Sequence, residues 1–239
     1  MIVEGINVVR ELLNECVKID KIIAQVTNNN EVIKLLDKAR AVGVSVSVLE
    51  KNDFLKYSKG ENQGIIAYIP NFKYAEIKDI FLTAERKNQP PFIVILDGIT
   101  DPHNLGAIIR TCECAGVHGV IIPKNRACEV NATVFKTSAG AVSHMKVVME
   151  TNLTNTIKDL KNQGVWVYGL EAGGKSIYNA DFSYPTALVI GSEGKGVSQL
   201  VSKNCDEILS LDMFGKINSL NASNAGAIAI YEVVRQRRS

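Results

Sequence analysis

The chain has 239 residues, of which 46% are hydrophobic and 22% charged, and its formal net charge is +2. These totals are ordinary for a globular protein and carry no strong signal for bulk attraction to nucleic acid or membrane. No apolar run reaches the roughly 18 residues of a membrane span, and no secretion signal is visible at the start, so we expect a cytoplasmic protein. The five cysteines are scattered and odd in number, which favours a reducing compartment over a disulfide framework.

Residues 1–70 are predicted to form a small α/β unit, because helical and strand periods alternate along them. The patterns predict three helices and three strands, in chain order a helix at 6–14, a strand at 21–26, a helix at 31–43, a strand at 44–50, a short helix at 52–57 and a strand at 64–70.

Residues 71–91 are polar and charged, and are expected to form a linker that carries a helix over 75–87. Because a double proline cannot continue a helix, Pro90-Pro91 marks a domain boundary.

Residues 92–239 are predicted to form a second α/β domain with a mostly parallel sheet. Its strands are continuous apolar runs, as is typical of strands covered on both faces: FIVIL, GVIIP, VWVYG, ALVIG and EILSL. Helical patterns separate these runs. The Cys112 and Cys114 side chains, two apart on a predicted helix, point to nearly opposite faces and are interpreted as small core residues, so no metal is expected.

The stretch GLEAGGKS, residues 169–176, fits the phosphate-loop pattern G-x-x-x-x-G-K-[ST]. A working phosphate loop leads directly into a helix, whereas IYNADFSYP follows here and opposes one. We therefore interpret Gly173-Gly174 as an ordinary turn. A nucleotide hydrolase that binds ATP through Lys175 remains a competing hypothesis.

Three later segments each consist of an apolar strand, a loop rich in Gly, Asn and Ser, and a helix. Because ligands bind at the carboxyl ends of parallel strands, the three loops are expected to converge into a single pocket. The first loop carries Asp97, Asp101, His103 and Asn104, the second is GSEGKG with Glu193, and the third is NSLNASN with Ser219 and Asn221.

Each of these loops also has a plain structural explanation. Arg110 has small neighbours on its helix and is interpreted either as a ligand-binding guanidinium or as a surface group paired with Glu113. Glu193 could be a solvated acid in a flexible turn. Asn221 and its neighbours could be redundant helix caps, although their number favours a polar ligand or a second chain.

The motifs LDGITDPHNLGAIIRTCECAG, ALVIGSEGKGVS and SLNASNAGAIAIYE, in this order over about 92–236, resemble the SpoU (TrmH-type) family of RNA ribose 2′-O-methyltransferases of the SPOUT class. Residues 1–70 resemble the ribosomal-protein-L30e-like RNA-binding domain of one subgroup, the 23S rRNA guanosine methyltransferases, through EGINVVRELL and ENQGIIAYIP. The resemblance implies an L30e-like domain at 1–70, a linker at 71–91 and a SPOUT domain with a deep trefoil knot at 92–239. It also implies a homodimer that shares its active site and binds S-adenosylmethionine.

Position by position, the resemblance assigns the chemistry of the site to Arg110, Asn104, Glu193, Ser219 and Asn221. It assigns the methyl donor to Gly191, Leu211, Leu220, Met213 and Gly194. Two positions depart from the family pattern: Asp212 replaces a usual proline, and Asn62 replaces a common histidine. The candidate phosphate contacts in the first domain are Lys18, Lys21, Lys56 and Lys59.

The expected reaction is methylation of a ribose 2′-hydroxyl in ribosomal RNA, with a guanosine of 23S rRNA as the first candidate. Arg110 is expected to contact that hydroxyl or its phosphate; whether it is also the base stays open, since a guanidinium loses its proton reluctantly. Methylation of transfer RNA and a non-catalytic RNA-binding role are two further hypotheses that compete with this expectation.

Overall fold

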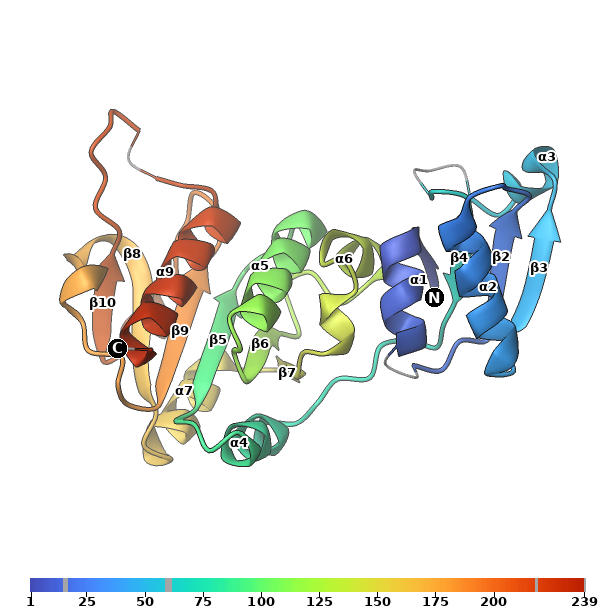
Figure 1. Ribbon diagram of the computed structural model, residues 1–239. Helices are drawn as coiled ribbons and strands as arrows, with labels where there is room; N and C mark the ends of the chain where they lie inside the picture. Colours follow the sequence, from blue (N-terminus) through green and yellow to red (C-terminus); the bar gives the residue numbers. More distant parts are fainter. Residues whose placement is uncertain (15–16, 59–61, 218, 239) are drawn as a thin grey trace. The chain divides into compact units, whose positions relative to one another are not determined.

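The computed structural model describes residues 1–14, 17–58, 62–217 and 219–238, which form two compact units (Figure 1). The first unit contains Met1–Lys73 together with Val130–His144, and the second contains Tyr74–Glu129 together with Met145–Ser239. Lys59, one of the candidate phosphate contacts, and Cys16, one of the five cysteines, lie outside the described residues.

The first unit has a four-stranded mixed sheet in the order β1-β4-β2-β3. The strands β2 and β3 are parallel, and β4 runs antiparallel to both β1 and β2. Its elements are β1 (Ile2–Glu4), α1 (Ile6–Asn14), β2 (Lys21–Gln25), α2 (Asn30–Ala41), β3 (Ser45–Leu49), α3 (Lys51–Phe54) and β4 (Ile65–Tyr68). All six predicted elements are present. The additional strand β1 has only three residues, too few to show a periodicity.

A segment from the second half of the sequence completes this unit. It contains α6 (Ala132–Thr137) and the 3₁₀ turn η1 (Ala141–Ser143). The Phe135 ring packs edge-on against Phe72 at 6.1 Å, and the His144 Nε2 lies 3.0 Å from the Glu11 carboxylate. Gly140 has a φ of +90°, and an added Cβ would lie 2.6 Å from the Glu11 Cβ. A glycine is therefore needed for this close approach.

The second unit has a six-stranded, fully parallel sheet in the order β10-β8-β9-β5-β6-β7. The strands are β5 (Phe92–Asp97), β6 (Gly119–Pro123), β7 (Val147–Glu150), β8 (Trp166–Ser176), β9 (Thr186–Gly191) and β10 (Glu207–Ser210). The helices are α4 (Ile77–Arg86), α5 (Pro102–Cys114), α7 (Leu153–Asn162), α8 (Gln199–Ser202) and α9 (Ala222–Arg237). All five predicted strands and the linker helix α4 are confirmed, whereas β7 is an addition.

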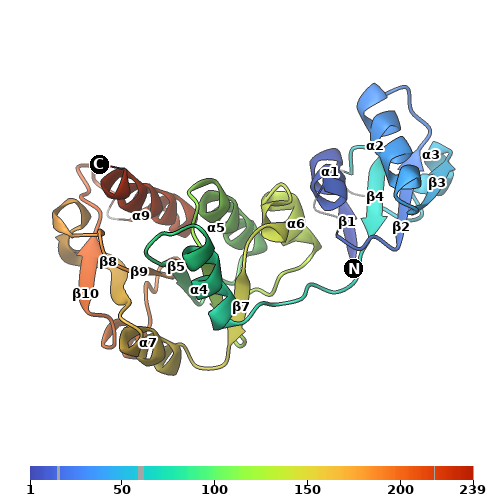
Figure 2. The same ribbon diagram turned by 60° about the horizontal axis from the view of Figure 1, so that its bottom comes forward.

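Helices cover both faces of this sheet, with α4 and α7 on one side and α5 and α9 on the other (Figure 2). Ile93 and Ile95 of β5 face α4 and α7, and pack into a core with Ile80 and Ile157. On the opposite face Gly226 of α9 brings that helix close, because an added Cβ would lie 2.8 Å from the Ile190 Cδ1. Burial on both faces explains why the strands are uninterrupted apolar runs.

The interpretation of the two cysteines on α5 is half correct. Cys112 is fully buried, and burial raises the pKa of its thiol, so this side chain belongs to the core. Cys114 is exposed instead, because residues two apart on a helix face opposite ways.

The phosphate-loop match lies inside β8, where it forms a bulge of several residues, and it is neither a phosphate loop nor an ordinary turn. Ile208 of β10 pairs with Gly169 of β8, but the next residue of β10, Leu209, pairs with Lys175. The residues of β8 between Gly169 and Lys175 therefore bulge out of the pairing. Only the short 3₁₀ turn η2 (Ile177–Asn179) follows, so the match does not lead into an α-helix. Lys175 pairs with Glu207 through a 3.1 Å contact. The physical basis of a phosphate loop is therefore missing.

Candidate active site

The three loops meet through a cluster of side-chain hydrogen bonds, which we call the Asn–Glu–Asn cluster: Asn104, Glu193 and Asn221. The Asn104 Nδ2 donates to the Glu193 Oε1 at 3.0 Å, and the Asn221 Nδ2 donates to the Asn104 Oδ1 at 3.0 Å and to the same Glu193 oxygen. Glu193 comes from the loop after β9, Asn221 from the end of the loop after β10, and Asn104 from the first turn of α5, directly after the loop that follows β5. The predicted convergence of these loops is confirmed.

The loop after β9 is a tight hairpin in which Ser192 and Gly196 exchange both backbone hydrogen bonds, at 3.1 and 2.9 Å. Gly194 and Gly196 have positive φ angles of 76° and 63°. Gly191 has no room for a side chain, since an added Cβ would lie 2.0 Å from the Gly196 carbonyl carbon. The hairpin thus needs its glycines for geometry, and it presents Glu193 at its tip.

The loop after β5 is held at both ends. The Asp97 carboxylate accepts a 2.7 Å hydrogen bond from the Ser198 backbone N–H, which ties this loop to the one after β9. Asp101 caps α5 by accepting from the His103 N–H at 2.9 Å, and Pro102 occupies the first helical turn. Asn104, in the first turn of this helix, is thereby directed at Glu193.

The loop after β10 ends at Asn221, the N-cap of α9. Its Oδ1 accepts from the Ser223 and Asn224 backbone N–H groups, at 2.9 and 3.3 Å. With the oxygen engaged in capping, the Nδ2 is left to donate to the cluster. Asn221 is therefore both a cap and a member of the site, and the two interpretations of this loop are compatible.

The loops enclose two neighbouring cavities, so the expectation of a single pocket is wrong. The first, which we call the donor cavity, has a volume of about 680 Å³. Its lining includes all five residues predicted for the methyl donor together with Glu193 and Ser219: Gly191, Leu211, Leu220, Met213 and Gly194. The hairpin at 192–196 lines both cavities, together with the first loop in one and with the third loop in the other.

Sequence reasoning missed one wall of the donor cavity. Leu170, Glu171, Ala172 and Gly173 line it from the bulge in β8. The signal was the glycine pair of the phosphate-loop match: Gly173 has a φ of +81°, and an added Cβ on Gly174 would lie 2.6 Å from the Ile208 carbonyl oxygen. Glycines inside a strand indicate a bulge or a close backbone approach.

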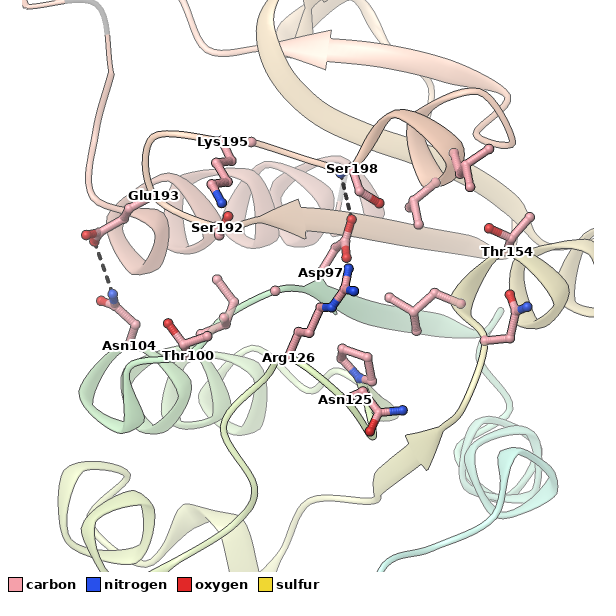
Figure 3. A pocket seen from close by; sticks show the side chains of 18 of the residues that line it. Asp97, Thr100, Asn104, Asn125, Arg126, Thr154, Ser192, Glu193, Lys195 and Ser198 are labelled. Atoms are coloured by element: carbon pink, nitrogen blue, oxygen red, sulfur yellow. Dashed lines mark hydrogen bonds between the residues drawn. The ribbon is translucent and has the colours of Figure 1, made fainter.

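The second cavity, which we call the polar cavity, has a volume of about 700 Å³ and shares Ser192, Glu193 and Gly196 with the donor cavity. It lies where β5, β6, β7 and β9 end (Figure 3). Asn104 lines it, and the Asn104–Glu193 hydrogen bond is drawn at its edge. The Asn–Glu–Asn cluster therefore stands at the boundary between the two cavities.

Arg110 lies apart from this cluster within one chain. It is exposed on α5 and is not among the residues that line either cavity. In the part of the chain that the structure describes, no ion pair joins it to Glu113. The structure thus does not support the surface-pair interpretation.

The two departures from the family pattern have local structural roles. Asp212 lines the donor cavity and accepts a 2.8 Å hydrogen bond from the Ser176 Oγ, which links the loop after β10 to the end of β8. Asn62 is buried, and its side chain donates to the Ser58 Oγ and accepts from the Gly64 N–H. Asn62 is therefore turned inward and contributes little to the exposed surface of the first unit.

The lysines predicted to contact phosphate differ in their exposure and in their ion pairing. Lys18 is exposed, Lys21 is half-buried at the start of β2, and Lys56 forms a 2.6 Å ion pair with Asp53.

In the described residues no helix is long and apolar enough to cross a membrane, and no group of three His, Cys, Asp or Glu side chains could hold a metal ion.

A parallel sheet with a glycine-lined cavity at its carboxyl edge, preceded by a small α/β unit, matches the fold of SPOUT-class methyltransferases. Comparison with known protein families supports the same class. Residues 91–231 match the SpoU rRNA Methylase family, and residues 2–75 match the RNA 2′-O ribose methyltransferase substrate-binding domain. The chain belongs to the SpoU family, and it is an S-adenosylmethionine-dependent RNA methyltransferase.

Among its relatives is YacO of Bacillus subtilis (strain 168), named as a TrmH family tRNA/rRNA methyltransferase. It is 40% identical over 235 residues, which cover 98% of this chain and 94% of YacO. The crystal structure of the SpoU methyltransferase AviRb from Streptomyces viridochromogenes in complex with AdoMet has a TM-score of 0.82 at 23% identity, covering 100% of this chain and 90% of AviRb. The AdoMet-bound rRNA methyltransferase from Sinorhizobium meliloti has a TM-score of 0.78 at 23% identity, covering 98% and 86%.

Proposed function

We propose that this chain methylates a ribose 2′-hydroxyl in ribosomal RNA, with a guanosine of 23S rRNA as the first candidate. The observation that carries the proposal is the Asn–Glu–Asn cluster at the boundary of two cavities. A methyl transfer needs a donor on one side of such a boundary and an acceptor hydroxyl within reach on the other.

The donor cavity suits S-adenosylmethionine by size and charge. Its volume of about 680 Å³ is within the range of small-molecule sites. The charged side chains in its lining are all acidic, namely Glu171, Glu193 and Asp212, and a cationic sulfonium would be favoured beside them.

When bound, the donor supplies an activated methyl group on its sulfonium. The carbon–sulfur bond breaks, a carbon–oxygen bond forms with the ribose 2′-oxygen, and the hydroxyl proton leaves to a base. We assign Glu193 to orienting Asn104 and Asn221, whose amides it holds, and Ser219 to the acceptor side of the donor cavity. These roles position the reactants.

We further propose that Arg110 completes the site of a second copy in a homodimer. It is exposed on α5, outside both cavities of its own chain. Apolar side chains are also exposed on the neighbouring α9 and on the loop before it: Phe214 (97%), Ile217 (75%), Ile228 (41%) and Tyr231 (51%). Large exposed apolar groups are typical of an interaction surface.

The Arg110→Ala variant should lose methyl transfer while it retains S-adenosylmethionine affinity in calorimetry. If Arg110 acts across the dimer, mixing this variant with Glu193→Ala restores activity, because one site of each mixed dimer is intact. Random exchange predicts about a quarter of wild-type activity. A complete absence of restoration in dimers shown to exchange would place Arg110 in its own chain's site.

The substrate is tested by mass mapping of ribose methyl groups in 23S and 16S rRNA from cells with and without the protein. A single guanosine in 23S rRNA that loses its methyl group is the expected result. Transfer RNA is the second candidate, because YacO is named as a tRNA/rRNA methyltransferase. Methyl groups lost from transfer RNA alone would replace the ribosomal proposal.

A further inference from the structure

The polar cavity has three carboxylates and two cationic side chains in its lining. Each carboxylate is engaged by the local structure: Asp97 accepts from Ser198 N, Asp101 from His103 N and Glu193 from the Asn104 amide. The acids therefore already accept hydrogen bonds from the protein, and these bonds hold the loops in place.

The two cations, Arg126 and Lys195, are not engaged in this way. Among the described residues neither has a hydrogen-bond or ion-pair partner. They reach the cavity from different loops, Arg126 from the one after β6 and Lys195 from the hairpin after β9 (Figure 3). Two unpaired cations that face one cavity are suited to an anion such as phosphate.

The backbone also holds Arg126 in an unusual conformation. Its φ is +58°, in the left-handed region that few residues other than glycine adopt. A conformation of this kind persists only where the surrounding structure requires it. Here it sets the direction in which the guanidinium leaves the loop.

We propose that the polar cavity receives the acceptor nucleotide, and that Arg126 and Lys195 bind the RNA phosphate adjacent to the reacting ribose. The inference rests on the proposed function and specifies its acceptor subsite. The shared wall of Ser192, Glu193 and Gly196 keeps the acceptor next to the donor cavity. Thr100 and Asn152 in the lining supply hydroxyl and amide groups for the sugar or base.

The test compares Arg126→Ala and Lys195→Ala with the control Lys124→Ala. Lys124 is exposed in the same loop as Arg126, but it does not line the cavity. In vitro transcripts of 23S rRNA and transfer RNA serve as probes. We expect the KM for the methylated RNA to rise about tenfold in each cavity variant, because a charge-assisted phosphate contact is lost. The S-adenosylmethionine affinity should not change.

Binding of the same transcripts at several salt concentrations gives a readout that does not depend on catalysis. Each cavity variant should lower the slope of log affinity against log salt by about 0.7, the value for one contact to a single strand. Arg126→Lys, which keeps the charge, should restore the slope. Lys195, on an exposed hairpin, provides a second variant if Arg126→Ala does not fold.

Slopes and KM values equal to those of Lys124→Ala in both cavity variants would overturn the acceptor subsite while leaving the proposed function intact. A wild-type protein that methylates neither transcript would instead contradict the proposed function. The salt slopes would still decide whether Arg126 and Lys195 contact RNA.

Discussion

Gly191 lies where β9 ends and the hairpin of the donor cavity begins. No side chain fits at this position, because an added Cβ would lie 2.0 Å from the Gly196 carbonyl carbon and 2.2 Å from the Val197 nitrogen. These are backbone atoms, which cannot rotate away as the end of a side chain can. The whole hairpin would have to move.

The substitution Gly191→Ala should lower S-adenosylmethionine affinity at least about tenfold and destabilise the fold by about 1–3 kcal/mol through overpacking. Calorimetry and urea unfolding measure the two effects. Gly164→Ala is the matched control, since Gly164 has a φ of +82° with no atom within 4 Å of an added Cβ. The control substitution should lower the free energy of unfolding by about 1–2 kcal/mol through backbone strain and leave the donor affinity unchanged. Equal donor affinity in both variants would contradict the role of the hairpin.

At the scale of elements, β5 is anchored at its start by His118. This side chain is 1% exposed; its Nδ1 accepts from the Phe92 N–H at 2.9 Å, and its Nε2 lies 3.1 Å from the Gln89 Oε1. Burial, reinforced by the charges of Lys87 and Arg237, lowers the pKa of His118 from 6.5 to about 4. The neutral imidazole is the form that fits this site.

Stability should therefore fall as the pH is lowered from 6.5 to 4. In that window the unfolded chain binds a proton at His118 that the folded chain does not, so the stabilising contribution is fully present above 6.5 and is lost towards 4. Urea unfolding across this range should show a shallower pH dependence for His118→Gln. The exposed His103 provides the control, and His103→Gln should keep the wild-type dependence. Identical curves for all three proteins would exclude His118 as the source.

The end of α9 is attached to the sheet by Arg237. Its guanidinium donates to four backbone carbonyls, and it lies over the Phe92 ring at 5.2 Å from the centroid. The acceptors are Pro90 O, Pro91 O, Phe182 O and Tyr184 O, at 2.7–3.2 Å. Burial lowers the pKa of Arg237 to about 10, so the group stays charged at neutral pH.

Arg237→Ala should destabilise the protein by about 2–4 kcal/mol, because four backbone carbonyls lose a charged donor. Arg237→Lys should recover little, since an ammonium does not reproduce the planar fork. The exposed neighbour Arg238 is the control, and its replacement by alanine should change the free energy of unfolding by less than about 0.5 kcal/mol. Thermal unfolding would count against the anchor if Arg237→Ala and Arg238→Ala had the same midpoint.

At the scale of the whole molecule, both cavities belong to one of the two units. All residues that line the donor and polar cavities belong to the second unit, whereas Val130–His144 belongs to the first. A change in this segment should therefore affect the first unit without affecting donor binding.

Gly140→Ala provides the test, because its Cβ would lie 2.6 Å from the Glu11 Cβ and the residue has a φ of +90°. We expect faster proteolytic cleavage within 130–144 and unchanged S-adenosylmethionine affinity. Gly43→Ala, at a φ of +80° with open space around it, controls for backbone strain alone. Loss of donor affinity in Gly140→Ala would show that the units depend on each other.

Local patterns in the sequence determined the elements and the class of this protein. Apolar runs predicted β5, β6, β8, β9 and β10, and loop chemistry singled out Asn104, Glu193 and Asn221. These signals are readable because period and loop composition depend on neighbours in the chain.

Tertiary structure alone decided the features that depend on distant partners. The Gly173-Gly174 bulge exists because β8 passes close to the Ile208 backbone, and the segment at 130–144 packs where it contacts Glu11 and Phe72. The hairpin at 192–196 divides one expected pocket into two. No local pattern encodes such contacts, since packing between residues far apart in sequence determines which surfaces meet and where space remains between them.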